Sequence, residues 1–256
     1  MNIIKNILAK NPCYKTGRTI TVKGLMLHSV GCSQPSASVF IRNWNNESFD
    51  RACVHGFIDA NTGDIHQTLP WNWRGWHGGG SSNNTHIGVE MCEPDCIKYI
   101  SGANFTCSDT AKAIKMVERT YNSAVELFAS LCKEFNLNPL EDGVIISHKE
   151  GYARGIASNH ADPEHLWKGL GLNYTMNTFR RDVQKAMNQF IPYRVKVLTS
   201  PLNIRKGAGT NYSITGSIED KGVYTIVAEK NGKGAIMWGK LKSGAGWISL
   251  DYTVKV

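Results

Sequence analysis

The chain has 256 residues, 41% of them hydrophobic, and a formal net charge of +8 at pH 7. This length predicts one large domain, or a domain with a small appendage, and the apolar fraction is typical of a globular protein with a buried core. No apolar run in the sequence approaches the roughly 20 residues that are needed to cross a bilayer, so we expect no membrane insertion.

Most of the positive charge lies in the last quarter of the chain. Residues 192–256 contain ten Lys or Arg against four Asp or Glu, whereas residues 1–191 contain nineteen against seventeen. A basic surface of this kind favours a polyanion, which could be nucleic acid, anionic lipid or a cell-wall polymer. Charge alone does not choose among these three.

The N-terminal segment and the cysteines both indicate a cytosolic origin. The segment MNIIKNILAKNPCYK contains lysines but no apolar run of about 7–15 residues and no small-residue cleavage site, so we read no secretory signal. The seven cysteines are odd in number, irregularly spaced and all placed before residue 133. This pattern is typical of reduced thiols rather than of a disulfide framework.

The first predicted elements are a strand, a helix and a hairpin. Residues 19–30 form a β-branched and apolar run that carries a histidine near its end, as in a buried strand. Residues 36–47 predict a short helix with Ser36 or Ser38 as its N-cap. Residues 52–70 alternate apolar and polar side chains around the turn AsnThrGlyAsp, which indicates a β-hairpin.

The following elements alternate in the same way. Residues 86–94 predict a short apolar strand, and residues 109–135 have apolar side chains every three or four positions, as in a long helix. After a breaker segment, residues 144–148 (VIISH) predict a strand and residues 175–187 a last helix. Because strands and helices alternate, we expect an α/β domain with a mixed central sheet that is flanked by helices.

The pattern of apolar and turn-forming residues changes after about residue 190. Short apolar runs are then separated by turns rich in Gly, Asn and Lys, which predicts a small all-β barrel or sandwich. We therefore divide the chain into an α/β domain at residues 1–190 and an all-β domain at residues 191–256.

Three side chains could form a metal site at one edge of the predicted sheet. His28 and His148 each end a predicted strand, and Asp162 lies in the segment that follows the second strand. Side chains at the ends of neighbouring strands can converge, and two imidazoles with one carboxylate suit Zn²⁺ and leave a fourth position for water. A single histidine at a strand end is more often structural, so the spacing alone is only moderately specific.

Several motifs carry a resemblance to a known family. LMLHSVG, GWHGGGSSNNTHIGVEMCEP and ISHKEGYARGIASNHADPEHLW resemble, in this order, the zinc-dependent N-acetylmuramoyl-L-alanine amidases of the amidase-2 type, which are related to the peptidoglycan recognition proteins. The resemblance covers roughly residues 20–185. In the tail, LNIRKGAGTNYSITG and GWISLDY resemble bacterial SH3-like modules that bind cell walls.

The resemblance implies a set of zinc ligands. By position, the family's ligands match His28, His148 and Asp162, with one Zn²⁺ per catalytic domain. The segment between the second and third ligands is longer than in many members of the family, and this leaves His160 as a rival for the third ligand.

The resemblance also implies roles around the metal. Glu90 matches an acidic residue that acts as general base, and His160 matches a position that stabilises the oxyanion of the tetrahedral intermediate. His77, Trp76, Arg154 and His165 are candidates for substrate binding. His77 could equally support a ligand or pack in the core, and Trp76 could equally be a core residue.

The implied function is hydrolysis of the amide bond between N-acetylmuramic acid and the L-alanine of the stem peptide. With no secretory signal, the expected protein is a phage or prophage endolysin, made in the cytoplasm and acting on cell-wall peptidoglycan after release. The alternatives are a recognition protein that binds peptidoglycan without cutting it, a bacterial autolysin, and a metallopeptidase that cuts within the stem peptide. We expect no nucleic-acid partner for the basic tail.

Overall fold

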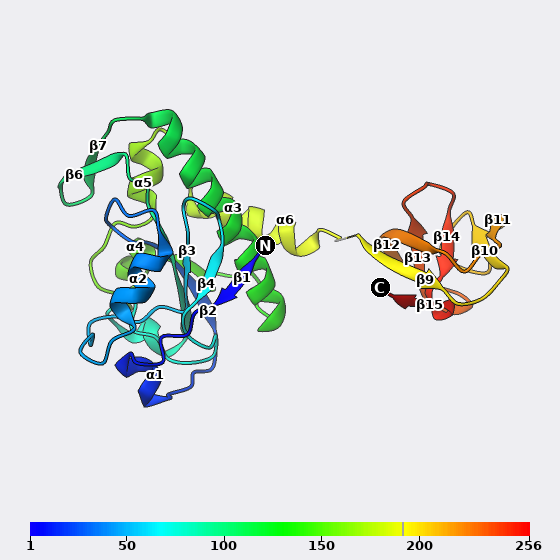
Figure 1. Ribbon diagram of the computed structural model, residues 1–256, viewed down its shortest axis with the longest axis horizontal. Helices are drawn as coiled ribbons and strands as arrows, with labels where there is room; N and C mark the ends of the chain where they lie inside the picture. Colours follow the sequence, from blue (N-terminus) through cyan, green and yellow to red (C-terminus); the bar gives the residue numbers. More distant parts are fainter. Residues whose placement is uncertain (191) are drawn as a thin grey trace. The chain divides into compact units, whose positions relative to one another are not determined.

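The computed structural model describes residues 1–190 and 192–256, which form two compact units, Met1–Asn188 and Gln189–Val256 (Figure 1). The expected domain boundary falls at Ile191, which lies outside the described residues. Each unit has a hydrophobic core of its own, so the two are described separately. No helix in the described part of the chain is both long enough and apolar enough to span a membrane.

The first unit is built on a six-stranded sheet. Its strands, in spatial order, are β1 (Ile3–Lys5), β4 (Ile65–Gln67), β3 (Gly56–Ile58), β5 (His86–Met91), β2 (Gly24–Ser29) and β8 (Ile145–Ser147). Strands β3 and β4 pair antiparallel, whereas the other neighbours pair parallel. This arrangement confirms the expected mixed central sheet.

Helices cover this sheet and complete the unit. They are α1 (Pro12–Thr16), α2 (Ala37–Trp44), the 3₁₀ turn η1 (Ser81–Asn84), α3 (Thr110–Glu134), α4 (His148–Ala153), α5 (Glu164–Gly169) and α6 (Met176–Asn188). The long helix α3 begins where the Asp109 side chain accepts a hydrogen bond from the backbone N–H of Lys112, an N-cap contact. Its apolar face is buried with α6, and Phe128 and Phe179 pack edge to face at 5.2 Å.

The central strands have two different faces because side chains alternate along a strand. Leu25 and Leu27 of β2, with Ile87 and Val89 of β5, are fully buried in the core that also contains α3 and α6. His28 follows Leu27 and therefore lies on the opposite face of the sheet. The sheet thus presents an apolar core on one face and, at the carboxyl ends of the strands, polar side chains on the other.

Several elements of this unit differ from the expectation, including the short β1 and α1 near the N-terminus. His148 begins the helix α4 instead of ending the predicted strand, and residues 149–153 and 164–169 are helical where the sequence suggested only a loop. The start of α4 is a capping box, since the Ser147 side chain accepts from the N–H of Glu150 while the Glu150 carboxylate accepts from the N–H of Ser147. A two-stranded hairpin, β6 (Ile97–Ser101) and β7 (Asn104–Cys107), also precedes α3. These elements are short, so sequence periodicity does not reveal them.

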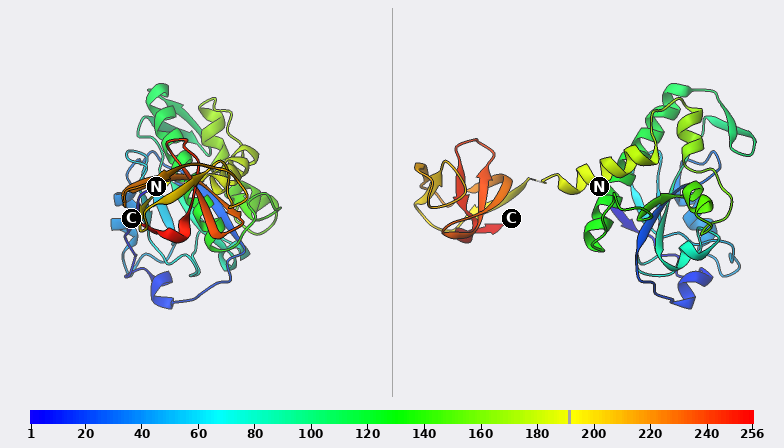
Figure 2. Two further views of the ribbon diagram at one scale, coloured as in Figure 1. Left: turned by 90° about the vertical axis from the view of Figure 1, so that its right-hand side faces the viewer. Right: turned by 180° about the vertical axis from the view of Figure 1, so that it is seen from behind.

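The second unit is all-β, as expected. Its seven-stranded sheet has the order β11 (Ile214–Ile218), β10 (Leu202–Arg205), β14 (Trp247–Ser249), β13 (Ala235–Leu241), β12 (Val223–Gly232), β9 (Tyr193–Val197) and β15 (Thr253–Lys255), with the turn η2 at Leu250–Tyr252. Neighbouring strands pair antiparallel. Figure 2 shows these strands from two further sides. Alternate side chains such as Val195 and Val197, together with Ile226, fill the core of this unit.

Candidate active site

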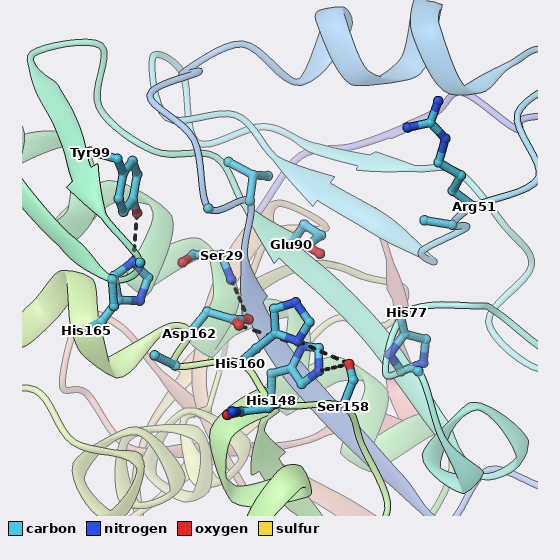
Figure 3. Close-up of a pocket in the computed structure, with 18 of the residues that line it drawn as sticks. Ser29, Arg51, His77, Glu90, Tyr99, His148, Ser158, His160, Asp162 and His165 are labelled. Carbon is cyan, nitrogen blue, oxygen red and sulfur yellow. Dashed lines mark hydrogen bonds and ion pairs between the residues drawn. The ribbon is translucent and has the colours of Figure 1, made fainter.

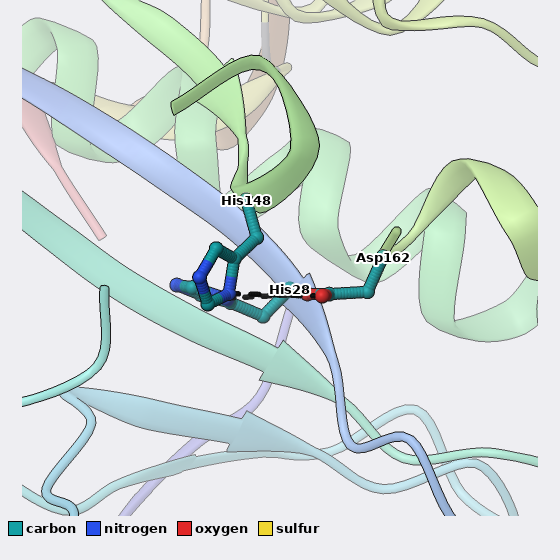
Figure 4. Close-up of side chains that lie close together, drawn as sticks. All are labelled: His28, His148 and Asp162. Carbon is teal, nitrogen blue, oxygen red and sulfur yellow. Dashed lines mark hydrogen bonds and ion pairs between the residues drawn. The ribbon is translucent and has the colours of Figure 1, made fainter. Parts of the chain in front are cut away.

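Three ligand-type side chains meet at the carboxyl end of the central strands (Figure 4). His28 comes from β2, His148 is the first residue of α4, and Asp162 lies in the segment before α5. The Nδ1 atoms of the two histidines are 3.1 Å apart. The Asp162 carboxylate lies 3.3 Å from Nδ1 of His28 and 3.6 Å from Nδ1 of His148. All three side chains are buried, so each is held in place by its surroundings.

A chain of hydrogen bonds determines which nitrogen of His28 faces the cluster. Nε2 of His77 lies 3.0 Å from the carbonyl oxygen of His86, to which it can only donate. Nδ1 of His77 is then an acceptor, and it lies 3.0 Å from Nε2 of His28. His28 therefore carries a proton on Nε2, and its Nδ1 atom faces Asp162 as the atom that can bind a metal.

The same reasoning applies to His148 and its neighbour His160. Nε2 of His148 lies 3.2 Å from Oγ of Ser158, and this hydroxyl lies 3.1 Å from Nδ1 of His160. The Ser158 hydroxyl also lies 3.3 Å from the carbonyl oxygen of Gly78, to which it can only donate, so its oxygen is left to accept from Nε2 of His148. His148 then also presents a bare Nδ1 to the cluster.

The protonation states suit a cation. Burial lowers the pKa of His148 to about 4, so its imidazole is neutral at neutral pH. Burial would raise the pKa of Asp162, but the hydrogen bond and the charge of His28 outweigh it and hold this pKa below its usual value. For His28, burial lowers the pKa, but the charge of Glu90 and the hydrogen bond and charge of Asp162 raise it by more. The pKa of His28 therefore lies above its usual value. The cluster therefore contains an anionic carboxylate between two imidazoles.

The spacing of the three ligand atoms fits a tetrahedral metal. Ligand–metal distances of about 2.0–2.1 Å in tetrahedral zinc sites place neighbouring ligand atoms about 3.3 Å apart. The three observed separations are 3.1, 3.3 and 3.6 Å. Among the described residues, His28, His148 and Asp162 form the group whose ligand atoms lie close enough together to hold a metal ion. Donor chemistry and spacing thus agree.

Glu90 stands beside the cluster on the neighbouring strand. It is the register partner of His28 in the parallel pair of β5 with β2. Burial raises the pKa of Glu90 to about 8, although the charge of His28 acts in the opposite direction. Among the described residues, its Oε2 atom is buried without a hydrogen-bond partner. An unpartnered carboxylate oxygen at the wall of an open site is available to exchange a proton with a ligand.

A cavity of about 760 Å³ opens over the cluster (Figure 3). His148, Asp162, Glu90 and the exposed His160 line it. Figure 3 shows Tyr99 and His165 on one side of Asp162, and Arg51 and His77 on the other. A substrate can therefore lie across the cluster and extend in both directions.

The comparisons with known proteins agree with this site. Residues 18–165, more than half of the chain, match the family model described as N-acetylmuramoyl-L-alanine amidase. The chain belongs to this family. It is a peptidoglycan amidase, a hydrolase of the amide bond between N-acetylmuramic acid and the L-alanine of the stem peptide. A sequence comparison with curated proteins gives no match.

Several solved structures are similar to the amidase. Staphylococcus aureus hydrolase AmiA, in complex with its ligand, is similar with a TM-score of 0.54 and 19% identity, over 73% of this chain and 83% of that chain. The catalytic domain of XlyA has a TM-score of 0.48 and 24% identity, over 72% of this chain and 99% of that chain. A mutant endolysin from Bacillus subtilis has a TM-score of 0.48 and 22% identity, over the same 72% and 99%.

His77 lines the cavity as a largely buried side chain. Its imidazole is engaged on both nitrogens, with His28 and with the carbonyl of His86. Gly88 makes room for it, because a Cβ at this position would lie 2.3 Å from Cγ of His77. This position behind His28 fits the supporting role that the sequence also allowed.

The other expected substrate-binding residues have different surroundings. Trp76 is 47% exposed and lines the cavity, so it is not a core residue. His165 also lines the cavity. Arg154 lies outside the lining of the cavity and pairs with Asp142. Because Asp142 holds this guanidinium away from the cluster, the structure does not bring Arg154 to the substrate.

Sequence reasoning named His165 but missed its partners. The hydroxyl of Tyr99, on β6, lies 2.6 Å from Oε2 of Glu93 and 2.7 Å from Nε2 of His165. Glu93 is fully buried and also accepts from the backbone N–H of Gly31 at 3.1 Å. This network joins β6, α5 and the segment after β2 at one wall of the cavity. The acidic Glu93 after an apolar strand was the one visible signal for these partners.

Proposed function

We propose that the amidase is zinc-dependent and that His28, His148 and Asp162 hold one Zn²⁺. The spacing of the three ligand atoms, with both Nδ1 lone pairs directed at the same point, is the observation that carries this proposal. When bound, Zn²⁺ would polarise the amide carbonyl, lower the pKa of a water molecule and favour the ionised form of Glu90.

We assign the proton transfers to Glu90. Its Oε2 atom takes a proton from the water that attacks the amide carbon, while the new C–O bond forms. The same atom then gives the proton to the nitrogen of L-alanine as the C–N bond breaks. The position of Glu90 beside His28, with this oxygen unpartnered, supports the assignment.

We assign stabilisation of the oxyanion to His160. Its Nδ1 atom lies 3.1 Å from Oγ of Ser158, and its imidazole is exposed at the cavity, where an Nε2–H can donate. A donor that is already oriented toward the developing negative charge lowers the barrier without reorganisation. In this arrangement Asp162 is the third ligand, and His160 is its catalytic neighbour.

The test is mass spectrometry of the fragments released from purified peptidoglycan, with and without a chelator. Stem peptides that begin with a free L-alanine amine, lost on chelation and restored by Zn²⁺, are expected. Cleavage inside the stem peptide would indicate a metallopeptidase instead. Wall binding without any release would indicate a recognition protein.

We further propose that the protein is a phage or prophage endolysin whose second unit is an SH3-like module that binds the wall. Residues 192–256 carry a net charge of +6, and Tyr212 and Tyr252 are partly exposed, which supports binding to an anionic polymer. Sedimentation of the full-length Glu90→Gln variant with purified walls tests this role. Binding should weaken between about 50 and 500 mM salt, because salt screens surface charge.

A further inference from the structure

A second cavity adjoins the first. It has a volume of about 780 Å³ and is lined by α4, α5 and the segment that leads into α6. Ala161 and His165 line both cavities. The two cavities therefore meet at these two residues. A long ligand can extend from the metal cluster over His165 into the second cavity.

The second cavity presents positive charge from two different helices. Lys149 of α4 and Lys168 of α5 are exposed there, and neither has a salt-bridge partner in the described part of the chain. Each carboxylate of this cavity has a partner other than these lysines. Glu150 pairs with Arg180, and Oε1 of Glu164 accepts from the Ser147 hydroxyl at 2.9 Å. Among the described residues, Oε2 of Glu164 is buried without a hydrogen-bond partner.

The two directions out of the metal cluster differ in chemistry. Trp76 is exposed and lines the first cavity, and its backbone pairs with Cys53, two residues after Arg51. Figure 3 shows Arg51 on the side of Asp162 opposite Tyr99 and His165. An aromatic face suits the C–H surface of a sugar. The side of His165 leads instead to the two lysines, which suit carboxylates. Because the bond that is cut joins a sugar to a peptide, the two halves of the substrate must leave the cluster in opposite directions.

We propose that the stem peptide runs from the metal cluster over His165 into the second cavity, where Lys149 and Lys168 hold the free carboxylate at its distal end. This inference rests on the proposed function, because it places the L-alanine amide at the cluster. An extended peptide advances about 3.3–3.6 Å per residue, so a longer stem peptide reaches further along this path toward the lysines. The second cavity therefore makes binding depend on the length and the terminal charge of the peptide.

The direct test is calorimetric binding of two synthetic stem tetrapeptides to the full chain, one with a free C-terminal carboxylate and one with a C-terminal amide. For the wild type, we expect the acid to bind about 3- to 10-fold more tightly, as for one or two exposed ion pairs. This preference should disappear in the variant Lys149→Ala/Lys168→Ala. It should persist in the matched control Lys115→Ala/Lys133→Ala, which removes two exposed lysines of α3.

Two results would overturn the inference: equal binding of both tetrapeptides by the wild type, or an unchanged preference in the Lys149/Lys168 variant. A matching kinetic result is also expected. The variant should lose about 3- to 10-fold in kcat/KM on a muramoyl tetrapeptide and nothing on a muramoyl dipeptide amide, whereas an equal loss on both would contradict the proposal. The calorimetric readout needs no turnover, so failure of the amidase mechanism would remain distinguishable from failure of this site.

Discussion

The two sides of the metal cluster are built in different ways. On one side, His28 and Glu90 are register partners in two adjacent, largely buried parallel strands. On the other side, Asp162 and His160 lie in the irregular segment between α4 and α5. Asp162 is nevertheless buried, because its carboxylate accepts from the N–H of Ser29 at 3.3 Å and its carbonyl oxygen from the N–H of Lys149. His160 is exposed.

This difference shows how an irregular segment can supply a precise ligand. His28 and Glu90 are fixed by the backbone hydrogen bonds of the sheet. Asp162 takes its position from its two hydrogen bonds with the backbone of Ser29 and Lys149. His160 has only the hydroxyl of Ser158 as a polar partner among the described residues. We therefore expect changes on the strand side to have the larger effects.

The largest effect is expected for Glu90→Gln. The amide keeps the size of the side chain but cannot take the proton, so kcat/KM should fall about 10²- to 10⁴-fold while the protein still binds one zinc. Steady-state kinetics and metal analysis check this. The exposed Glu134→Gln on α3 is the matched control and should be unaffected. A fully active Glu90→Gln would remove Glu90 from the mechanism.

Glu93→Gln removes the buried carboxyl group that follows β5 and accepts from the Tyr99 hydroxyl of the β6–β7 hairpin. Burial raises the pKa of Glu93 from 4.5 to about 7, so the folded state binds this proton more tightly than the unfolded chain. The free energy of unfolding should therefore fall between about pH 4.5 and pH 7, by about 3 kcal/mol from this one group, and stay level above. Urea unfolding of the metal-free proteins measures the free energy of unfolding at each pH. The variant should lack the decrease that Glu93 contributes between about pH 4.5 and pH 7. Parallel pH profiles would contradict the expectation.

His77→Ala tests the support behind His28. Loss of the acceptor for Nε2 frees the imidazole to rotate or change tautomer, so zinc affinity should fall about 10- to 100-fold. Competition with a chromogenic chelator measures this affinity. His77→Gln retains a carbonyl acceptor and should lose less. Equal affinities for the wild type and both variants would show that the hydrogen bond does not orient the ligand.

The smallest effect is expected for His160→Ala, on the loop side. His160 is exposed, so solvent screens its contribution, and kcat should fall only about 10-fold. Zinc content should stay near one per chain. Loss of the metal in this variant would make His160 a ligand and would overturn the assignment of Asp162.

Much of the first unit could be predicted from the sequence because its signals are local. The strands around His28 and Glu90 are continuous apolar runs, and α3 has a regular apolar period over 25 residues. The ligand positions follow from strands that end at one edge of the sheet. The resemblance of three motifs to a known family then supplied the roles.

The rest depended on contacts between residues that are distant in the chain. Nothing near Arg154 in the motif shows that Asp142 holds its guanidinium, and nothing near Tyr99 shows that its hydroxyl bridges Glu93 and His165. The β6–β7 hairpin is also half-exposed, so it lacks the apolar periodicity that reveals buried strands. Such pairings exist only after the chain has folded.

Gly88 illustrates how far the demands of this site reach into the sheet. It has no functional group and lies in the middle of β5, yet its missing side chain leaves the space that the His77 ring fills. Even alanine would push that ring away from His28. In a library of all single substitutions screened for lysis, Gly88 should therefore tolerate as few replacements as a catalytic residue. A position without a functional group would then be as constrained as a metal ligand.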